Sequence, residues 1–183
     1  MRQHKEHIFA AKDLDMENME IRIDTNAIRH RLYRMSGHIS LSRHAMGGGE
    51  KIADIVRLTD DEKQTIEELV PTAVNDVAAV IGRIFPSCTI RHIDAADGNT
   101  TVYAICFGVP HNYPTELATN VERYAEEFVL YNILRQWMQL VKPDEAATVQ
   151  SEMEKNIRAL QMALTARKKP TKDETEQDNI IEL

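Results

Sequence analysis

One long amphipathic stretch, residues 113–141, constrains the fold more than any other part of the chain. Its apolar side chains recur at steps of three and four residues, which is the repeat of one helix face. Pro114 and Thr115 suit a helix start, because proline loses no hydrogen bond in the first turn. A helix of this length would span roughly 40 Å. Further apolar residues such as Leu140 widen the stripe, so contacts on more than one side are expected.

This stretch predicts a central core helix in a small, mostly helical domain. We expect its core to include residues of the stripe together with two apolar residues of an earlier helix. These expected core residues are Phe128, Leu134, Trp137, Val77 and Ile81.

Two more helices are predicted, one on each side of the central one in the sequence. Residues 59–85 repeat the three/four stripe, and Thr59 with Glu62 suits a capping box. Pro71 lies inside this stripe and predicts a kink or short break. Residues 145–167 carry apolar residues at near-heptad spacing, with Asp144 as a cap. That narrow seam suits one partner helix, in the same chain or in a neighbour.

The periodicity changes to two over residues 88–109, which predicts a β-hairpin. The tripeptide 97–99, Asp-Gly-Asn, is a strong turn signal between the two alternating runs. A turn there would bring Cys88 and Cys106 near one another across the strands. We expect two reduced thiols, and a regulatory disulfide is the less favoured alternative. Residues 20–23 alternate in the same way and indicate a short strand.

Charge is unevenly distributed along the chain. The net charge of −7 disfavours a general nucleic-acid binder, although residues 25–46 carry arginine and histidine without any acid. Those residues predict a helix with arginines on its polar face, which Gly37 weakens and favours ending early. Its candidate partner-binding residues are Arg29, Arg31, Arg34 and Arg43.

The end of the chain, residues 171–183, is acidic but finishes in apolar residues. Alone it should be disordered, and a solvated tail is one interpretation. A docking peptide is the other, because a charged tether with an apolar tip gains by burying that tip. The candidate docking residues are Ile180, Ile181 and Leu183.

Together these patterns predict a mainly α fold. It is a bundle of three to four helices with one inserted β-hairpin and extended terminal arms. Residues 1–50 form an N-terminal arm with the basic helix, and three glycines at 47–49 act as a hinge. Residues 51–169 form the helical body, and residues 170–183 form the acidic tail. No apolar run is long enough to span a bilayer and no hydrophobic signal region opens the sequence, which favours a cytoplasmic protein.

Motifs that would indicate an enzyme are missing from the sequence. It contains no GxSxG, HExxH or CxxC motif. His4 with His7, and Cys88 with His92, are loosely spaced as metal ligands are, but no further ligands follow at a zinc-site interval. Glu126 and Glu127 are adjacent on one helix, so we expect two solvated side chains rather than an acid/base couple. We therefore expect no enzymatic activity, no metal and no cofactor.

Residues 60–83, DDEKQTIEELVPTAVNDVAAVIGR, resemble the first core helix of tailed-phage head–tail connector (adaptor or neck) proteins. The step LVPTA at 69–73 and the closing Gly82-Arg83 carry the likeness. The family continues with an inserted loop or hairpin, a helix that begins at proline, and a final helix. Residues 60–168 follow that order, whereas residues 1–50 depart from the compact pattern of the family.

The resemblance implies a non-enzymatic structural protein of the virion neck, assembled in the cytoplasm of a bacterial host. Members form a dodecameric ring beneath the portal protein, join it to the tail proteins, and surround the DNA channel. Proximity to DNA would be non-specific, and no membrane is involved. The acidic tail would then dock on a neighbouring subunit or on the portal, and the basic helix would face an acidic partner surface.

Two other functions remain open at this point. The first is a cytoplasmic helical regulator or nucleic-acid-binding module that acts through the basic helix 25–46. The second, and less favoured, is a metal-dependent enzyme.

Overall fold

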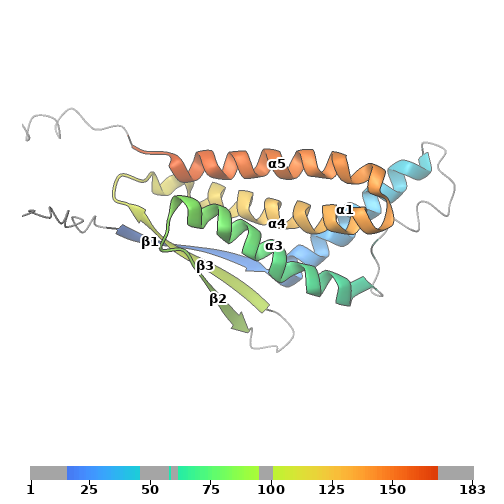
Figure 1. Ribbon diagram of the computed structural model, residues 1–183, viewed down its shortest axis with the longest axis horizontal. Helices are drawn as coiled ribbons and strands as arrows, with labels where there is room; N and C mark the ends of the chain where they lie inside the picture. Colours follow the sequence, from blue (N-terminus) through green and yellow to red (C-terminus); the bar gives the residue numbers. More distant parts are fainter. Residues whose placement is uncertain (1–15, 46–57, 59–61, 95–100, 169–183) are drawn as a thin grey trace, which may run out of the picture.

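The computed structural model describes residues 16–45, 58, 62–94 and 101–168. Within these residues, four helices pack with a three-stranded antiparallel sheet, so the predicted mainly helical fold is confirmed. Figure 1 shows the elements in chain order from blue to red. They are β1 (Met16–Asp24), α1 (Thr25–Ala45), α3 (Lys63–Ile84), β2 (Thr89–Asp94), β3 (Thr101–Pro110), the 3₁₀ turn η2 (Thr115–Leu117), α4 (Ala118–Val141) and α5 (Pro143–Thr165).

The helix α4 is the centre of this arrangement. It contacts α5, α3, α1 and β1, so its apolar residues are shielded on several sides, as its wide stripe predicted. Leu140 is an exception, since it is 69% exposed. Near the end of α4 the buried apolar residues are Trp137 and Met138, so the buried stripe is narrower there than in the middle of the helix. The predicted core residues are all buried: Phe128, Leu134, Trp137, Val77 and Ile81.

The helix α5 folds back along α4 after the single residue Lys142. Its seam, which includes Val149, Leu160 and Leu164, is buried against the core, so the partner helix that the spacing required is α4 of the same chain. Pro143 is the first residue of α5, because proline is tolerated at that position. Asp144 lies inside the first turn and is not the cap.

The helix α3 runs through Pro71 without interruption, so of the predicted kink or short break, the break is wrong. Buried residues on both sides of the proline, including Val70 and Ala73, hold the two halves of the helix against the same core. The N-cap is Glu62, which makes no side-chain cap bond. Thr59, the other half of the expected capping box, lies outside the described residues.

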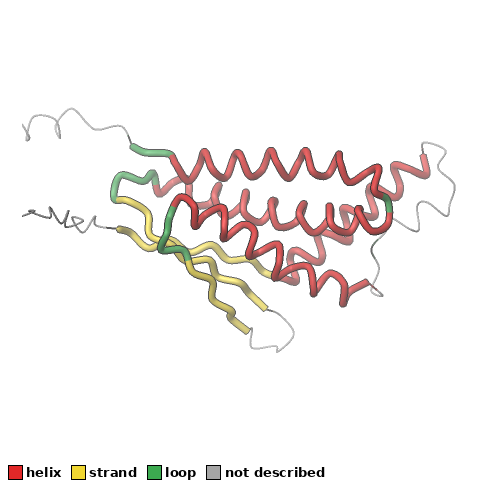
Figure 2. The backbone as a smooth tube through the Cα atoms, in the orientation of Figure 1, coloured by secondary structure: helices red, strands yellow, loops and turns green. Residues whose placement is uncertain are grey.

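The sheet has the strand order β1-β3-β2. The predicted hairpin is confirmed, with Ile90 opposite Ile105, while its turn at 95–100 lies outside the described residues. The strand predicted at 20–23 is longer, because β1 pairs with β3 from Met16 opposite Pro110 onward. Figure 2 shows the strands on one side of the helices.

The N-terminal part of the described chain belongs to the helical body. Ile21 and Ile23 of β1, with Ile28 and Leu32 of α1, are buried in the same core as the later helices. The predicted boundary at residue 50 and the glycine hinge at 47–49 lie outside the described residues. The expected early end of α1 at Gly37 is also wrong, since the helix continues to Ala45.

Replacing Trp137 by Ala should destabilise the protein by about 3–5 kcal/mol, because a large buried ring leaves a cavity. Chemical denaturation of the two proteins measures the difference. The matched control is Leu140→Ala on the same helix, where an exposed side chain predicts a change within about 0.5 kcal/mol. Equal effects of the two substitutions would show that Trp137 is not part of the core.

Candidate functional site

Two arginines of the basic helix α1 form ion pairs with glutamates of other helices in the same chain. Arg31 contacts Glu127, and its Nη1 lies 3.5 Å from Oε2 of Glu126. Arg29 Nη1 lies 3.5 Å from Oε1 of Glu67 on α3. Of the other two candidate arginines, Arg34 is exposed, and the side chain of Arg43 lies outside the described residues.

The two adjacent glutamates of α4 are not the solvated side chains that the sequence indicated. The side chains of Glu126 and Glu127 are only 33% and 25% exposed, and both reach Arg31. Neighbouring residues on a helix point to different sides, but a planar guanidinium with five donors can contact both when another helix crosses there. The contact joins α1 to α4, and one cation faces two carboxylates.

Burial raises the pKa of Glu126, and the attraction of Arg31 offsets this only in part. Glu122, Glu127 and Asp24 lie close enough to add repulsion that raises the pKa further. The cluster is therefore a structural contact with an excess of negative charge.

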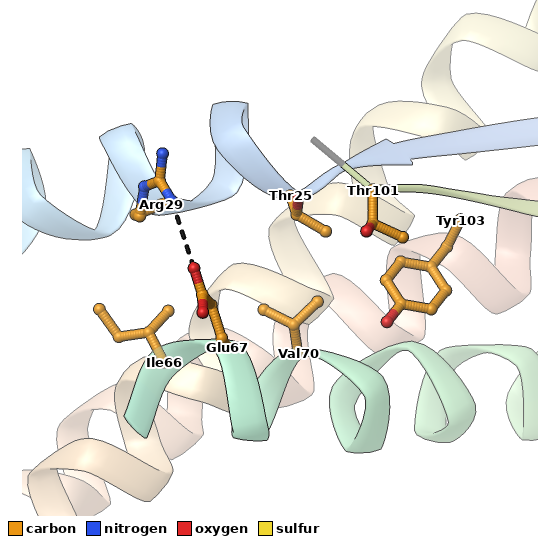
Figure 3. Close-up of a pocket in the computed structure, with 7 residues that line it drawn as sticks. All are labelled: Thr25, Arg29, Ile66, Glu67, Val70, Thr101 and Tyr103. Atoms are coloured by element: carbon orange, nitrogen blue, oxygen red, sulfur yellow. Dashed lines mark ion pairs between the residues drawn. The ribbon is translucent and has the colours of Figure 1, made fainter. Parts of the chain in front are cut away.

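A cavity of about 250 Å³ opens between the start of α1, the helix α3 and the strand β3 (Figure 3). Ile66 and Val70 form an apolar wall, and the Arg29–Glu67 ion pair spans it from α1 to α3. Burial raises the pKa of the Tyr103 hydroxyl at the other end. The lining residues are Thr25, Arg29, Ile66, Glu67, Val70, Thr101 and Tyr103.

The cavity therefore combines an apolar wall with an ion pair and a phenol hydroxyl. Among the described residues that line it there is no serine, cysteine or histidine. Among the described residues, no group of three or more metal-ligating side chains occurs. His4 and His7, the more N-terminal candidate pair, lie outside the described part of the chain.

The face of the sheet that carries Glu20 holds a second charged cluster. Glu20 accepts a hydrogen bond from Arg22 Nε at 2.7 Å and another from Arg91 Nη2 at 2.5 Å. The bond from Arg22, with the charge of both arginines, lowers the pKa of Glu20. Two guanidinium groups share one carboxylate, so the cluster keeps a net positive charge.

The two cysteines are close in the strand register but lie on opposite faces of the sheet. Cys106 is opposite Thr89, the residue after Cys88, and successive side chains of a strand alternate between faces. Cys106 Sγ lies 3.6 Å from Glu20 Oε2, whereas Cys88 Sγ lies 3.6 Å from the carbonyl oxygen of Ala78. Both thiols are free in the structure, and burial raises the pKa of Cys88.

Sequence reasoning missed the internal partners of the basic helix. A signal existed, because the polar side of α4 carries Glu122, Glu126 and Glu127 within two turns. The cavity had no comparable signal, since its residues come from three separate elements. The expected docking residues Ile180, Ile181 and Leu183 lie outside the described residues.

None of the described helices is long and apolar enough to cross a membrane. No family model, no curated protein and no solved structure matches the chain.

Replacing Arg31 by Ala should destabilise the fold by about 1–3 kcal/mol, between the values for exposed and buried ion pairs. The physical reason is that two partly buried carboxylates lose their cation. The control is Arg34→Ala on the same helix, which removes an equal charge from an exposed position. Thermal and chemical denaturation should find Arg31→Ala much less stable than Arg34→Ala. The opposite order of stability would show that the cluster has no structural role.

Glu126→Gln should make the protein more stable at neutral pH. The raised pKa means that the folded chain favours the protonated form of Glu126. That contribution to stability is present below the ordinary pKa of 4.5 and is lost as pH rises through the folded value. Glutamine imitates the protonated form, so its advantage should appear as pH rises and vanish below pH 4.5.

Melting curves of the parent and of Glu126→Gln across pH measure this difference. In an Arg31→Ala background the advantage should grow, because the cation that partly stabilises the carboxylate is gone. A variant that is less stable than its parent at neutral pH would contradict the prediction.

Proposed function

We propose that the chain is a head–tail connector of a tailed phage. In this function it joins the portal of the capsid to the tail as a ring around the DNA channel. The observation that carries the proposal is the order of elements from α3 to α5. A helix with an internal proline step is followed by a hairpin, a long helix preceded by Pro114, and a closing helix. This is the order that the resemblance in residues 60–83 implies for the rest of such a chain.

Exposed apolar side chains also support an assembly role. Met162 is 74% exposed on α5, and Leu140, Met16 and Ile93 are exposed on three other elements. Scattered exposed residues are ordinary for one chain alone. A ring needs two different patches on each copy, however, because head-to-tail contacts close only through unlike surfaces. Residues on separate elements can supply such patches.

In this function the partners are further copies of the chain, in a dodecamer by resemblance, the portal protein and the tail proteins. The DNA in the channel is a non-specific neighbour. The protein would lie in the virion neck after assembly in the cytoplasm of the bacterial host. It would have no enzymatic role and no cofactor.

The alternative is a regulator or nucleic-acid-binding module that acts through α1. The ion pairs of Arg29 and Arg31 count against it, because a phosphate would have to displace Glu67, Glu126 or Glu127. The glutamates already neutralise part of the positive charge of α1 that would attract a phosphate.

Light scattering and electron microscopy of the full-length protein test the proposal, both alone and mixed with the portal protein of the same genome. We expect closed rings or a stable complex with the portal. A protein that stays monomeric at every concentration and does not bind the portal would overturn the proposal.

A salt series with labelled duplex DNA tests the alternative on the same samples. Tight binding by the monomer that falls steeply with salt, and that Arg34→Ala weakens, would favour the nucleic-acid module. Weak binding that Arg34→Ala leaves unchanged is expected for the connector.

A further inference from the structure

The strand β2 is an exposed edge of the sheet. Among the described strands it pairs with β3 alone, so its other side has no strand beside it. Five of its six residues are exposed, and only Ile90 is partly covered. Figure 1 shows β2 at the margin of the sheet, on the side away from α4 and α5.

An edge of this kind offers a row of backbone donors and acceptors to an added strand. Proteins usually blunt such edges with lysine, proline or a bulge. The sequence of β2, TIRHID, contains neither lysine nor proline, and its charged residues are Arg91 and Asp94. Its pairing with β3 runs without a bulge from Thr89 opposite Cys106 to Asp94 opposite Thr101.

The side chains along this edge favour an acidic and apolar strand. Arg91 is 61% exposed and shares Glu20 with Arg22, which leaves net positive charge on the face of β2 that carries Arg91. Asp94, the acid of β2, lies on the other face. Ile93 is 38% exposed although it is a large apolar residue. Together they offer one cationic contact and one apolar contact two residues apart on the same face of the strand.

We propose that the C-terminal segment of this chain, residues 171–183, adds to the free edge of β2 as a fourth, antiparallel strand. The segment carries five acidic residues against the single Lys172 and ends in Asn-Ile-Ile-Glu-Leu. One antiparallel register pairs each of the last five residues, 179–183, with a compatible residue of β2. It sets Leu183 opposite Ile90, Glu182 opposite Arg91, Ile181 opposite His92, Ile180 opposite Ile93, and Asn179 opposite Asp94.

This register satisfies charge and apolar contact together. Glu182 meets Arg91 and Ile180 meets Ile93 on one face, and opposite charges or apolar pairs across strands are stabilising. A shift by one residue would turn the side chains to the wrong face, so the register is specific.

The length of the chain allows the contact. The backbone N–H of Lys168 donates to the carbonyl oxygen of Asn112 at 2.8 Å, which places the start of the tail near the end of β3. From there the tail must travel the length of β3, from Pro110 to Thr101, and cross to the free edge of β2, which together is about 32 Å. Residues 169–179 can extend over about 36 Å. The strand can therefore come from the same copy, and a neighbouring copy can supply it equally well.

Disulfide trapping in the full-length protein tests the register. In a background with Cys88→Ser and Cys106→Ser, the pair Ile93→Cys and Ile180→Cys should cross-link fast under mild oxidation. Ile93→Cys with Ile181→Cys should react several-fold more slowly, because residue 181 lies on the other face. Met162→Cys with Ile180→Cys should also be slow, although Met162 is exposed and close to the base of the tail.

Equal rates for the three pairs would overturn the proposal, since they would show a tail that only diffuses past each site. Unchanged circular dichroism confirms that each variant is folded. The size of the trapped product tells whether the strand comes from the same copy or from a neighbour, and either origin supports the assignment. The result does not depend on ring formation, so it is separate from the test of the connector function.

A charge exchange tests the Arg91–Glu182 contact. Arg91→Glu should slow trapping several-fold, and adding Glu182→Arg should restore it. The control is Arg22→Glu, which loses the same partner Glu20 but lies on β1. Equal effects of Arg91→Glu and Arg22→Glu, or no rescue by the exchange, would overturn this contact.

Discussion

The burial of α4 on several sides is the constraint on which the described structure depends. Val129, Leu130 and Ile133 are fully shielded, and each such side chain contributes about 1.5–3 kcal/mol when it leaves water. One partner helix could not cover them all. The chain uses α5, α3, α1 and β1 together, which explains why a strand and helix far earlier in the sequence are part of the same core.

Much of this fold was predictable because its helices carry their own signal. The three/four stripes located α3, α4 and α5, and period-two alternation located the hairpin β2–β3. The full length of β1 was not predictable, because the side chains of Met16, Glu17 and Asn18 are exposed and show no alternation. Residues 16–18 are part of the strand because their backbone pairs with β3. Gly37 and Pro71 similarly remain helical because packing outweighs a local preference.

The candidate sites were less predictable, since they depend on which surfaces meet. The basic segment of the sequence suggested an external acidic partner, and α4 supplies two acids for Arg31 within the chain. A basic segment in a sequence therefore indicates that an acidic partner exists, but not whether that partner belongs to the same chain. The cavity beside Tyr103 combines residues of α1, α3 and β3, and its apolar wall at Ile66 and Val70 continues the core stripe of α3. No local pattern distinguishes those wall residues from ordinary core positions.

The helices and the sheet leave different opportunities for assembly. An α-helix satisfies its own backbone except at its ends, so the faces of α4 and α5 can offer only side chains. A sheet satisfies its backbone only through neighbours, and at β2 one neighbour is absent from the described residues. The same holds for β1, the other edge strand, so the edges of the sheet are where a partner strand gains hydrogen bonds as well as side-chain contacts. Register gives such a contact a specificity that apolar patches alone do not provide.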